Sequence, residues 1–177
     1  MKKEAFWAEQ YRRHIGKMVG ACYRYVADWD LAEDLAQDAF LAAMEKASTF
    51  RAFGSFEGWL KKIAINQALM HLRDCPEMVE WDENLHSQEV EEIADDPELS
   101  RTEFTQEELL EVVGKLPVKQ RTVFNLYALE HYSHSKIAET LGISVANSKV
   151  LLSRARAELQ QRLKAVARKK IRMYNVE

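Results

Sequence analysis

The chain has 177 residues, of which 47% are hydrophobic and only six are glycine and three proline. That length suits one ordinary domain or two small ones, and few breakers combined with 3.6-residue apolar periodicity predict an all-α protein. No apolar run reaches the roughly 18 residues of a membrane span, and the N-terminus lacks the apolar segment of a signal peptide. Cys22 and Cys75 have no CxxC spacing, which argues against a disulfide or zinc scaffold and predicts a cytoplasmic protein.

The overall net charge of −3 hides three segments of different charge. Residues 1–74 carry a net charge of +1, residues 75–111 carry −13 and residues 112–177 carry +9. A basic segment is the electrostatic footprint of a surface that binds a polyanion. A dense acidic run without periodicity is typical of a solvated linker. The charge pattern therefore predicts a basic nucleic-acid-binding part that follows an acidic connector.

Three helices are expected in the N-terminal part. The first spans about residues 4–27 and has one apolar stripe. Asp30, with Glu33 three residues later, has the pattern of a capping box, so the second helix is expected to begin there and end near residue 48. Ser55 is expected to cap a third helix that ends just before the first proline. These helices predict a small three-helix domain.

The C-terminal part is expected to be a second helical domain. The preceding residues 75–104 show no period and are predicted to form an extended acidic linker. Thr105 and Glu108 have the spacing of another capping box. Further helices are expected over residues 118–130, 133–141 and 145 to beyond 163, with a basic tail that frays after residue 167.

The segment SHSKIAETLGISVANSKVLLSRARAEL, residues 133–159, is typical of a helix-turn-helix. Gly142 stands where the turn needs a left-handed residue, and Ser144 can cap the second helix. On that helix, Lys and Arg can bind phosphates and Asn can read a base edge in the major groove. The residues expected to contact duplex DNA are Ser144, Val145, Asn147, Lys149, Ser153, Arg154 and Arg156. The alternative is an ordinary helical hairpin with a solvated basic face.

Three segments together resemble the extracytoplasmic-function (ECF) group of RNA polymerase sigma factors. LPVKQRTVFNLYALEHYSHSKIAETLGIS resembles the family's fourth conserved region, DLAEDLAQDAFLAAMEK its polymerase-binding helix, and FRAFGSFEGWLKKIAINQALMHLR its promoter-melting segment. The resemblance covers about residues 10–73 and 105–163. It implies an all-α fold with sigma region 2 at 1–74 and sigma region 4 at 105–177, joined by the acidic linker 75–104.

The second helix has an acidic face opposite its alanine-rich side. The resemblance implies that this face docks on the coiled coil of the polymerase clamp, with Leu35 and Leu41 able to add apolar contact. The expected polymerase-binding residues are Glu33, Asp34, Gln37, Asp38 and Leu41. The alternative is an acidic face that is merely solvated.

Aromatic residues in and beside the loop before the third helix, followed by cations, suit an unstacked base and its phosphates. By resemblance this surface recognises and melts the minus-ten element. The expected contact residues are Phe53, Ser55, Phe56, Lys62, Asn66 and Arg73. The alternative for Phe56 and Trp59 is that they are simply part of the hydrophobic core and do not contact DNA.

The sequence therefore predicts a sigma factor that binds core RNA polymerase through the beta-prime clamp and the beta subunit. Region 2 would melt the minus-ten element as single strands, and region 4 would read the minus-thirty-five element as duplex. No catalytic site, cofactor or metal is expected, since GxxxxGK, GxGxxG and HExxH are absent and His131 and His134 are expected to be surface or capping residues. Departures from the family pattern at Met70, Ala146 and Leu151 leave open a separate DNA-targeting recruiter, and an anti-sigma factor is the other open partner.

Two other classes of protein compete with this prediction. A DNA-binding regulator would use only residues 133–160 and would leave the acidic face and the aromatic loop idle. An interaction protein would use the acidic linker as its partner site and would show no affinity for DNA at low salt. An enzyme is the class with the least support.

Overall fold

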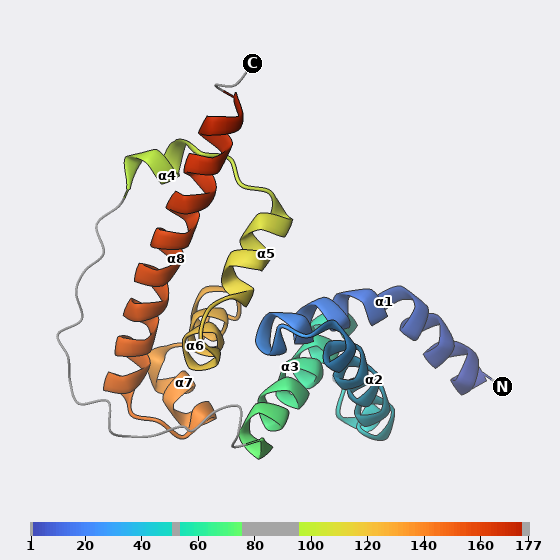
Figure 1. Ribbon diagram of the computed structural model, residues 1–177. Coiled ribbons are helices and arrows are strands. Elements are labelled where there is room, and N and C mark those ends of the chain that lie inside the picture. Colours follow the sequence, from blue (N-terminus) through green and yellow to red (C-terminus); the bar gives the residue numbers. More distant parts are fainter. Residues whose placement is uncertain (1, 51–53, 76–95, 175–177) are drawn as a thin grey trace. The chain divides into compact units, whose positions relative to one another are not determined.

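The computed structural model describes residues 2–50, 54–75 and 96–174 (Figure 1). Within these ranges the regular elements are all helical, which confirms the predicted all-α class. The chain divides into two compact units, Met1–Val79 and Glu80–Glu177, each described by itself below. None of the described helices is long and apolar enough to cross a membrane.

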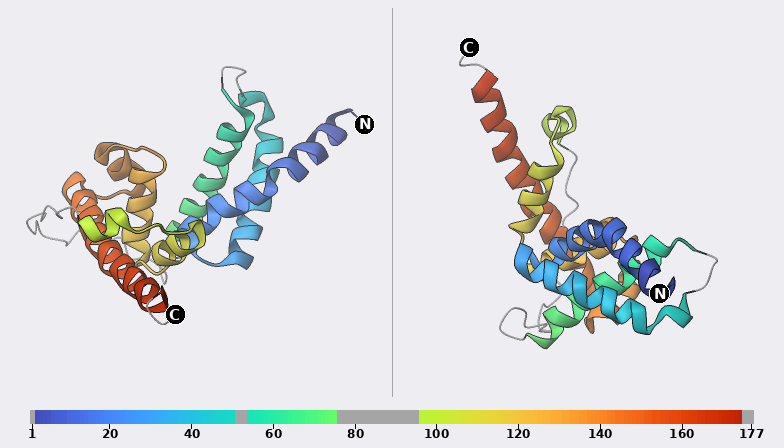
Figure 2. Two further views of the ribbon diagram at one scale, coloured as in Figure 1. Left: turned by 90° about the horizontal axis from the view of Figure 1, so that it is seen from above. Right: turned by 90° about the vertical axis from the view of Figure 1, so that its right-hand side faces the viewer.

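Unit 1 is a three-helix domain made of α1 (Lys2–Val26), α2 (Trp29–Glu45) and α3 (Phe56–Asp74), with a short 3-10 turn, η1 (Ala47–Thr49), after α2. Each of the three helices packs against the other two (Figure 2). The buried face of α2 is built largely from small side chains, which let the neighbouring helices approach closely. Its fully buried alanines are Ala32, Ala36, Ala39 and Ala43.

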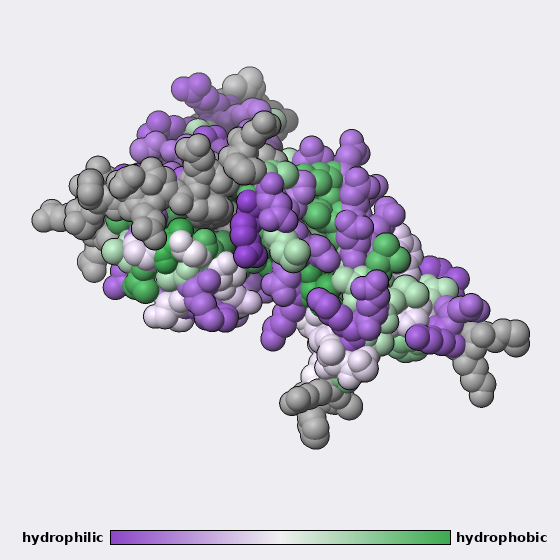
Figure 3. Space-filling model, turned by 90° about the horizontal axis from the view of Figure 1, so that it is seen from below, coloured by the Kyte–Doolittle hydropathy of each residue, from purple (hydrophilic) through white to green (hydrophobic). Residues whose placement is uncertain are grey.

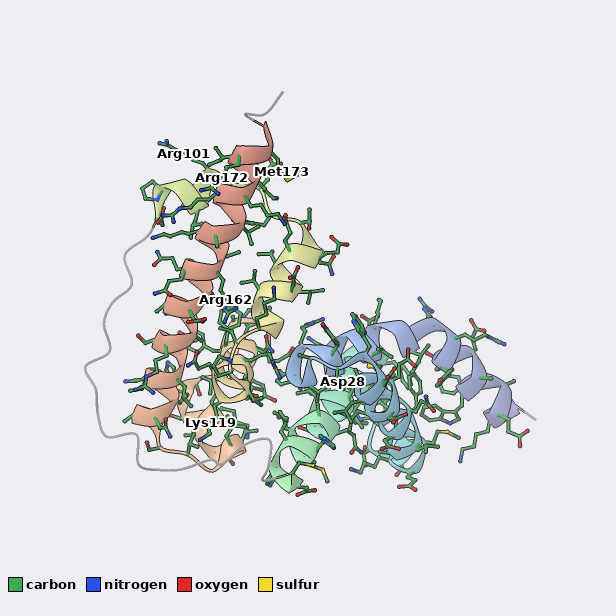
Figure 4. All side chains as sticks on the ribbon, viewed as in Figure 1. Asp28, Arg101, Lys119, Arg162, Arg172 and Met173 are labelled. Atoms are coloured by element: carbon green, nitrogen blue, oxygen red, sulfur yellow. The ribbon has the colours of Figure 1, made fainter. Side chains whose placement is uncertain are left out.

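The start of α2 differs from the prediction. Asp28, not Asp30, is the N-cap, and its carboxylate accepts a hydrogen bond from the Leu31 amide at 3.0 Å. The preceding Ala27 adopts a left-handed backbone with φ of 52°, so the chain has already turned when it reaches Asp28 (Figure 4). The capping box predicted for Asp30 and Glu33 is therefore wrong. The predicted cap of α3 is confirmed, since the Ser55 hydroxyl accepts from the Gly58 amide at 2.9 Å.

Unit 2 is organised around one long helix. Its elements are α4 (Pro97–Arg101), α5 (Gln106–Gly114), α6 (Val118–Ala128), α7 (His134–Leu141) and α8 (Val145–Tyr174). The other four helices all pack on α8, which runs the length of the unit (Figure 1). One core cluster beneath α5 consists of Val112, Leu116, Ala155 and Leu159. The predicted capping box at the start of α5 is confirmed, with Thr105 and Glu108 hydrogen bonded to each other's backbone amides.

Two expectations about the ends of unit 2 are wrong. The short helix α4 lies inside the range predicted to be extended, because Asp96 caps it and pairs with Lys164 of α8 at 2.7 Å. The basic tail remains helical to Tyr174, because Lys170 bonds the Glu108 carboxylate at 2.6 Å and the Glu103 carbonyl at 2.7 Å. Arg101, Arg172 and Met173 mark this end of the unit (Figure 4). The acidic stretch 76–95 lies outside the described residues.

Candidate protein and nucleic-acid interfaces

The outer face of α2 is acidic and exposed. Four of the five residues predicted for it, Glu33, Asp34, Gln37 and Asp38, are exposed, and the fifth, Leu41, is 60% exposed. Among the residues that the structure describes, none of the three carboxylates has an ion-pair partner. The alanine side of α2 packs in the domain, and the outer face carries charge that no described residue neutralises in an ion pair.

Leu35 does not belong to this face, contrary to the expectation that it flanks the acidic residues. It is only 6% exposed, because it follows Ala32 by three residues and precedes Ala39 by four, which places it on the buried side. The exposed apolar surface at the other end of α2 comes from Leu41 and from Met44, which is 41% exposed. The two leucines therefore have opposite roles.

A groove beside the acidic face was not predicted from the sequence. It has a volume of about 480 Å³ and is lined by residues of both α1 and α2. Trp29, which is 55% exposed, stands at one end and stacks on Tyr23 with ring centroids 3.8 Å apart. The lining residues are Tyr11, Ile15, Gly16, Val19, Trp29, Glu33 and Gln37. Because Glu33 and Gln37 belong to both surfaces, the groove continues the α2 face.

The start of α3 is built on a cluster of aromatic rings. Phe56 is half-buried at its centre, and the neighbouring ring centroids lie between 5.6 and 5.9 Å from it. Those neighbours are Phe6, Trp7, His14, Phe50 and Trp59. The structure thus gives Phe56 and Trp59 packing contacts, and it commits the Ser55 hydroxyl to the cap of α3. Phe53 lies outside the described residues.

One face of α3 presents polar and basic side chains to solvent. Lys62, Asn66 and Arg73 are exposed, and Met70, between them, is 48% exposed. Their spacing of three and four residues puts all four on one side of the helix. Lys62, Asn66 and Arg73, which are predicted to contact the minus-ten element, therefore form a continuous stripe along α3. Ser55 and Phe56 lie at the start of the helix, where they cap it and pack in the aromatic cluster.

The helix-turn-helix predicted from the sequence is present as α7, a tight turn and α8. Gly142 has φ of 67° and ψ of 34°, the left-handed conformation that favours glycine. The Ser144 hydroxyl accepts from the Asn147 amide at 3.0 Å and so caps α8. Ile143 and Leu152 are 7% and 4% exposed, so both belong to the packed interior of unit 2.

The residues predicted to contact duplex DNA differ in how exposed their side chains are. The exposed members are Ser144, Val145, Lys149 and Arg156, and the half-buried members are Ser153 and Arg154. Asn147 is only 2% exposed and Leu151 only 3%. Their four-residue spacing continues to Ala155 on the packed side of α8. The expectation that Asn147 presents its amide to a base edge is therefore wrong for this structure, and Leu151 is packed in the same way.

The cysteines and histidines do not gather into a ligand set in the parts that the structure describes. Cys22 is fully buried and its thiol lies 3.5 Å from the Ala64 carbonyl. Burial raises the pKa of Cys22 to about 12, so the thiol stays protonated and unreactive.

On the face shown in Figure 3, hydrophobic residues form small patches among hydrophilic ones.

Comparison with known proteins identifies the family of the chain. The model of the family Sigma-70 region 2 matches residues 10–75, and that of Sigma-70, region 4, matches residues 106–159. The chain is 30% identical over 156 residues to the ECF RNA polymerase sigma factor SigW of Bacillus subtilis, covering 84% of this chain and 83% of the relative. It is 29% identical over 165 residues to the RNA polymerase sigma factor YlaC of the same organism, covering 92% and 95%.

Among solved structures, the sigma factor RpoE of Bartonella quintana, crystallised with the anti-sigma factor NepR, shares the fold. Its TM-score is 0.52 at 20% identity, and the alignment covers 89% of this chain and 96% of that chain. The chain belongs to the ECF RNA polymerase sigma factors. It is therefore a subunit that directs promoter-specific transcription initiation, as the sequence predicted, and membership implies a non-catalytic role.

Proposed function

We propose that the two units divide promoter recognition between them. Unit 1 binds the beta-prime clamp of core polymerase through the outer face of α2 and opens the minus-ten element with α3 and the loop before it. Unit 2 binds the minus-thirty-five element as duplex DNA through α8 and contacts the beta subunit. We propose accordingly that the protein acts in the cytoplasm, where polymerase works. One observation carries the proposal, namely the acidic α2 face whose carboxylates have no ion-pair partner among the described residues.

The α2 face suits a basic helical partner. Charged groups that have no ion-pair partner among the described residues can steer a complementary surface and fix its register. Leu41 adds an apolar contact at one end of the face, and the groove ending at Trp29 adds another beside it. A coiled coil that lies along α2 would cover the acidic residues and both apolar ends. This supports docking rather than mere solvation of the face.

The α3 stripe suits the strands of an opened minus-ten element. Lys62 and Arg73 can neutralise phosphates, and Asn66 lies between them with a donor and an acceptor for a base edge. Ser55 and Phe56 would act indirectly, because capping and ring packing fix the place where the loop joins α3. Phe53 keeps its proposed role of holding an unstacked base.

The exposed start of α8 suits a major groove but offers few base-reading groups. With Asn147 buried, sequence reading is left to Ser144, Val145 and Lys149, and Arg154 and Arg156 can bind phosphates. Phosphate contacts alone are largely blind to sequence. This supports the proposal that a separate DNA-targeting partner helps to bring the protein to its promoters. The crystallised complex of the Bartonella sigma factor also supports regulation of this chain by an anti-sigma factor.

Charge reversal on α2 tests the docking surface. Asp34→Lys and Asp38→Lys, made together, should abolish binding of core polymerase while the helical content stays unchanged. Asp74→Lys is the control, because Asp74 is exposed at the end of α3 and its reversal leaves the acidic residues of α2 unchanged. Binding of core polymerase by the double variant with wild-type affinity would contradict the proposed docking.

A further inference from the structure

His134 is held by side chains from two other helices of unit 2. Its ring stacks on Tyr127 of α6 with centroids 4.9 Å apart and an interplanar angle of 27°. Its Nδ1 lies 2.9 Å from the hydroxyl of Ser148, a fully buried residue of α8. On α8, the Arg156 guanidinium carbon lies 5.5 Å from the centroid of the same Tyr127 ring. The imidazole is thus fixed at the junction of the helix-turn-helix, and it is only half-buried.

The surroundings of His134 are cationic. Burial lowers the pKa of His134, and the charges of Lys149 and Arg156 lower it further. No carboxylate contributes to this pKa shift, and the charged neighbour on α7 itself, Lys136, is already paired with Glu139 at 2.9 Å. Lys149 and Arg156 are both exposed and lie two turns apart on one side of α8. His134 and Arg156 both lie against the Tyr127 ring, and the charges of Lys149 and Arg156 both reach the imidazole.

We propose that His134, Lys149 and Arg156 together hold one phosphodiester group of duplex DNA, and that His134 takes up a proton from solvent when that phosphate binds. The inference rests on the proposed duplex binding by unit 2 and adds His134 to that interface. Lys149 and Arg156 repel a protonated imidazole in the free protein. A phosphate placed among the three groups offsets that repulsion and attracts the imidazolium directly.

The direction of the pH dependence follows from this linkage. In free protein the lowered pKa keeps His134 neutral near pH 7. In the complex the phosphate favours the charged form and raises the pKa, so duplex affinity is higher at low pH and falls as pH rises through the pKa of the complex. Each unit by which DNA raises that pKa gives about a tenfold gain in affinity between the two pH limits. The extra contact should also steepen the salt slope of log K by about 0.9 at low pH.

The test uses the full-length chain and a duplex that contains its minus-thirty-five element. Calorimetric titrations in two buffers of different ionisation enthalpy, between about pH 6 and pH 8, report the protons taken up on binding. His134→Gln keeps a hydrogen-bonding side chain, and His134→Phe keeps a ring that can stack on Tyr127, but neither can be protonated. His131→Asn is the matched control, because His131 is exposed and has a left-handed backbone, which asparagine tolerates.

Wild type and His131→Asn should take up a fraction of a proton and bind more tightly at the lower pH. Both His134 variants should bind without proton uptake and with a flat pH profile. Proton uptake that survives in both His134 variants, or none in wild type, would overturn the proposal. A wild-type chain that binds no duplex at any pH would instead contradict the function proposed for unit 2, whereas a His134 variant that is weaker at every pH but keeps the wild-type pH slope would reduce His134 to a structural role.

Discussion

Leu41 and Leu35 lie on the same helix, α2, but truncating them should have different effects: the first on binding of core polymerase, the second on stability. Leu41 is 60% exposed and Leu35 is 6% exposed. Full burial of a leucine side chain is worth about 1.5–3 kcal/mol, so covering the exposed part of Leu41 on docking should contribute about 1–2 kcal/mol. Leu41→Ala should therefore weaken binding of core polymerase about 5- to 30-fold. Because Leu35 is in the core, Leu35→Ala should cost about 2–5 kcal/mol of unfolding free energy.

Two measurements on each variant separate docking from folding. Denaturant unfolding gives the loss of stability, which for Leu41→Ala should stay below about 1 kcal/mol. Anisotropy of the labelled chain, titrated with core polymerase, gives the loss of affinity. The reasoning fails if Leu41→Ala destabilises the fold as much as Leu35→Ala does, or if it binds core polymerase as tightly as wild type.

Four further predictions concern the other surfaces. Arg73→Ala should weaken binding of both single-stranded and duplex minus-ten DNA in gel-shift assays, because a phosphate contact does not depend on unstacked bases. Lys149→Gln should lower the magnitude of the salt slope of duplex binding by about 0.9. The hydrogen bond from Lys170 lowers the pKa of Glu108 in the folded protein. The stability that this hydrogen bond adds is therefore present above the carboxyl pKa of the unfolded chain and is lost as pH falls through the pKa of folded Glu108. Lys170→Ala should lower the melting temperature near neutral pH, and the difference from wild type should shrink in acid. A neutral linker of equal length in place of residues 76–95 should reduce initiation or promoter escape in single-round transcription.

Local signals in the sequence located most of the helix boundaries. Ser55 and Thr105 are caps because the residues that they bond lie three positions away, and Gly142 supplies a left-handed turn that few residues can replace. The start of α2 was predicted two residues late, because Asp28 and Asp30 are equally good N-cap residues in the sequence. The left-handed backbone at Ala27, just before the observed cap Asp28, is not signalled by an alanine side chain.

Contacts between distant residues could not be predicted in the same way. Periodicity showed that α8 has a packed side, but not that Asn147 and Leu151 both lie on it. The polar Asn147 suggested an exposed face and the apolar Leu151 a buried one, although the two residues are one turn apart. The persistence of α8 beyond residue 167 depends on Lys170, whose partners are more than sixty residues earlier in the chain. The imidazole of His134 likewise owes its place to Tyr127 and to a serine on another helix.

Transcription with purified components tests the central claim most directly. Core polymerase and this chain alone, at moderate salt, are offered the promoters of its own genome together with unrelated promoters. We predict run-off transcripts that exceed those of core polymerase alone, favour some promoters over others, and rise further when cell extract supplies the DNA-targeting partner. They should be lost when Asp34 and Asp38 are both changed to Lys. Transcription no greater than that of core polymerase alone, or equal from every template, would contradict the claim that this chain directs promoter-specific initiation.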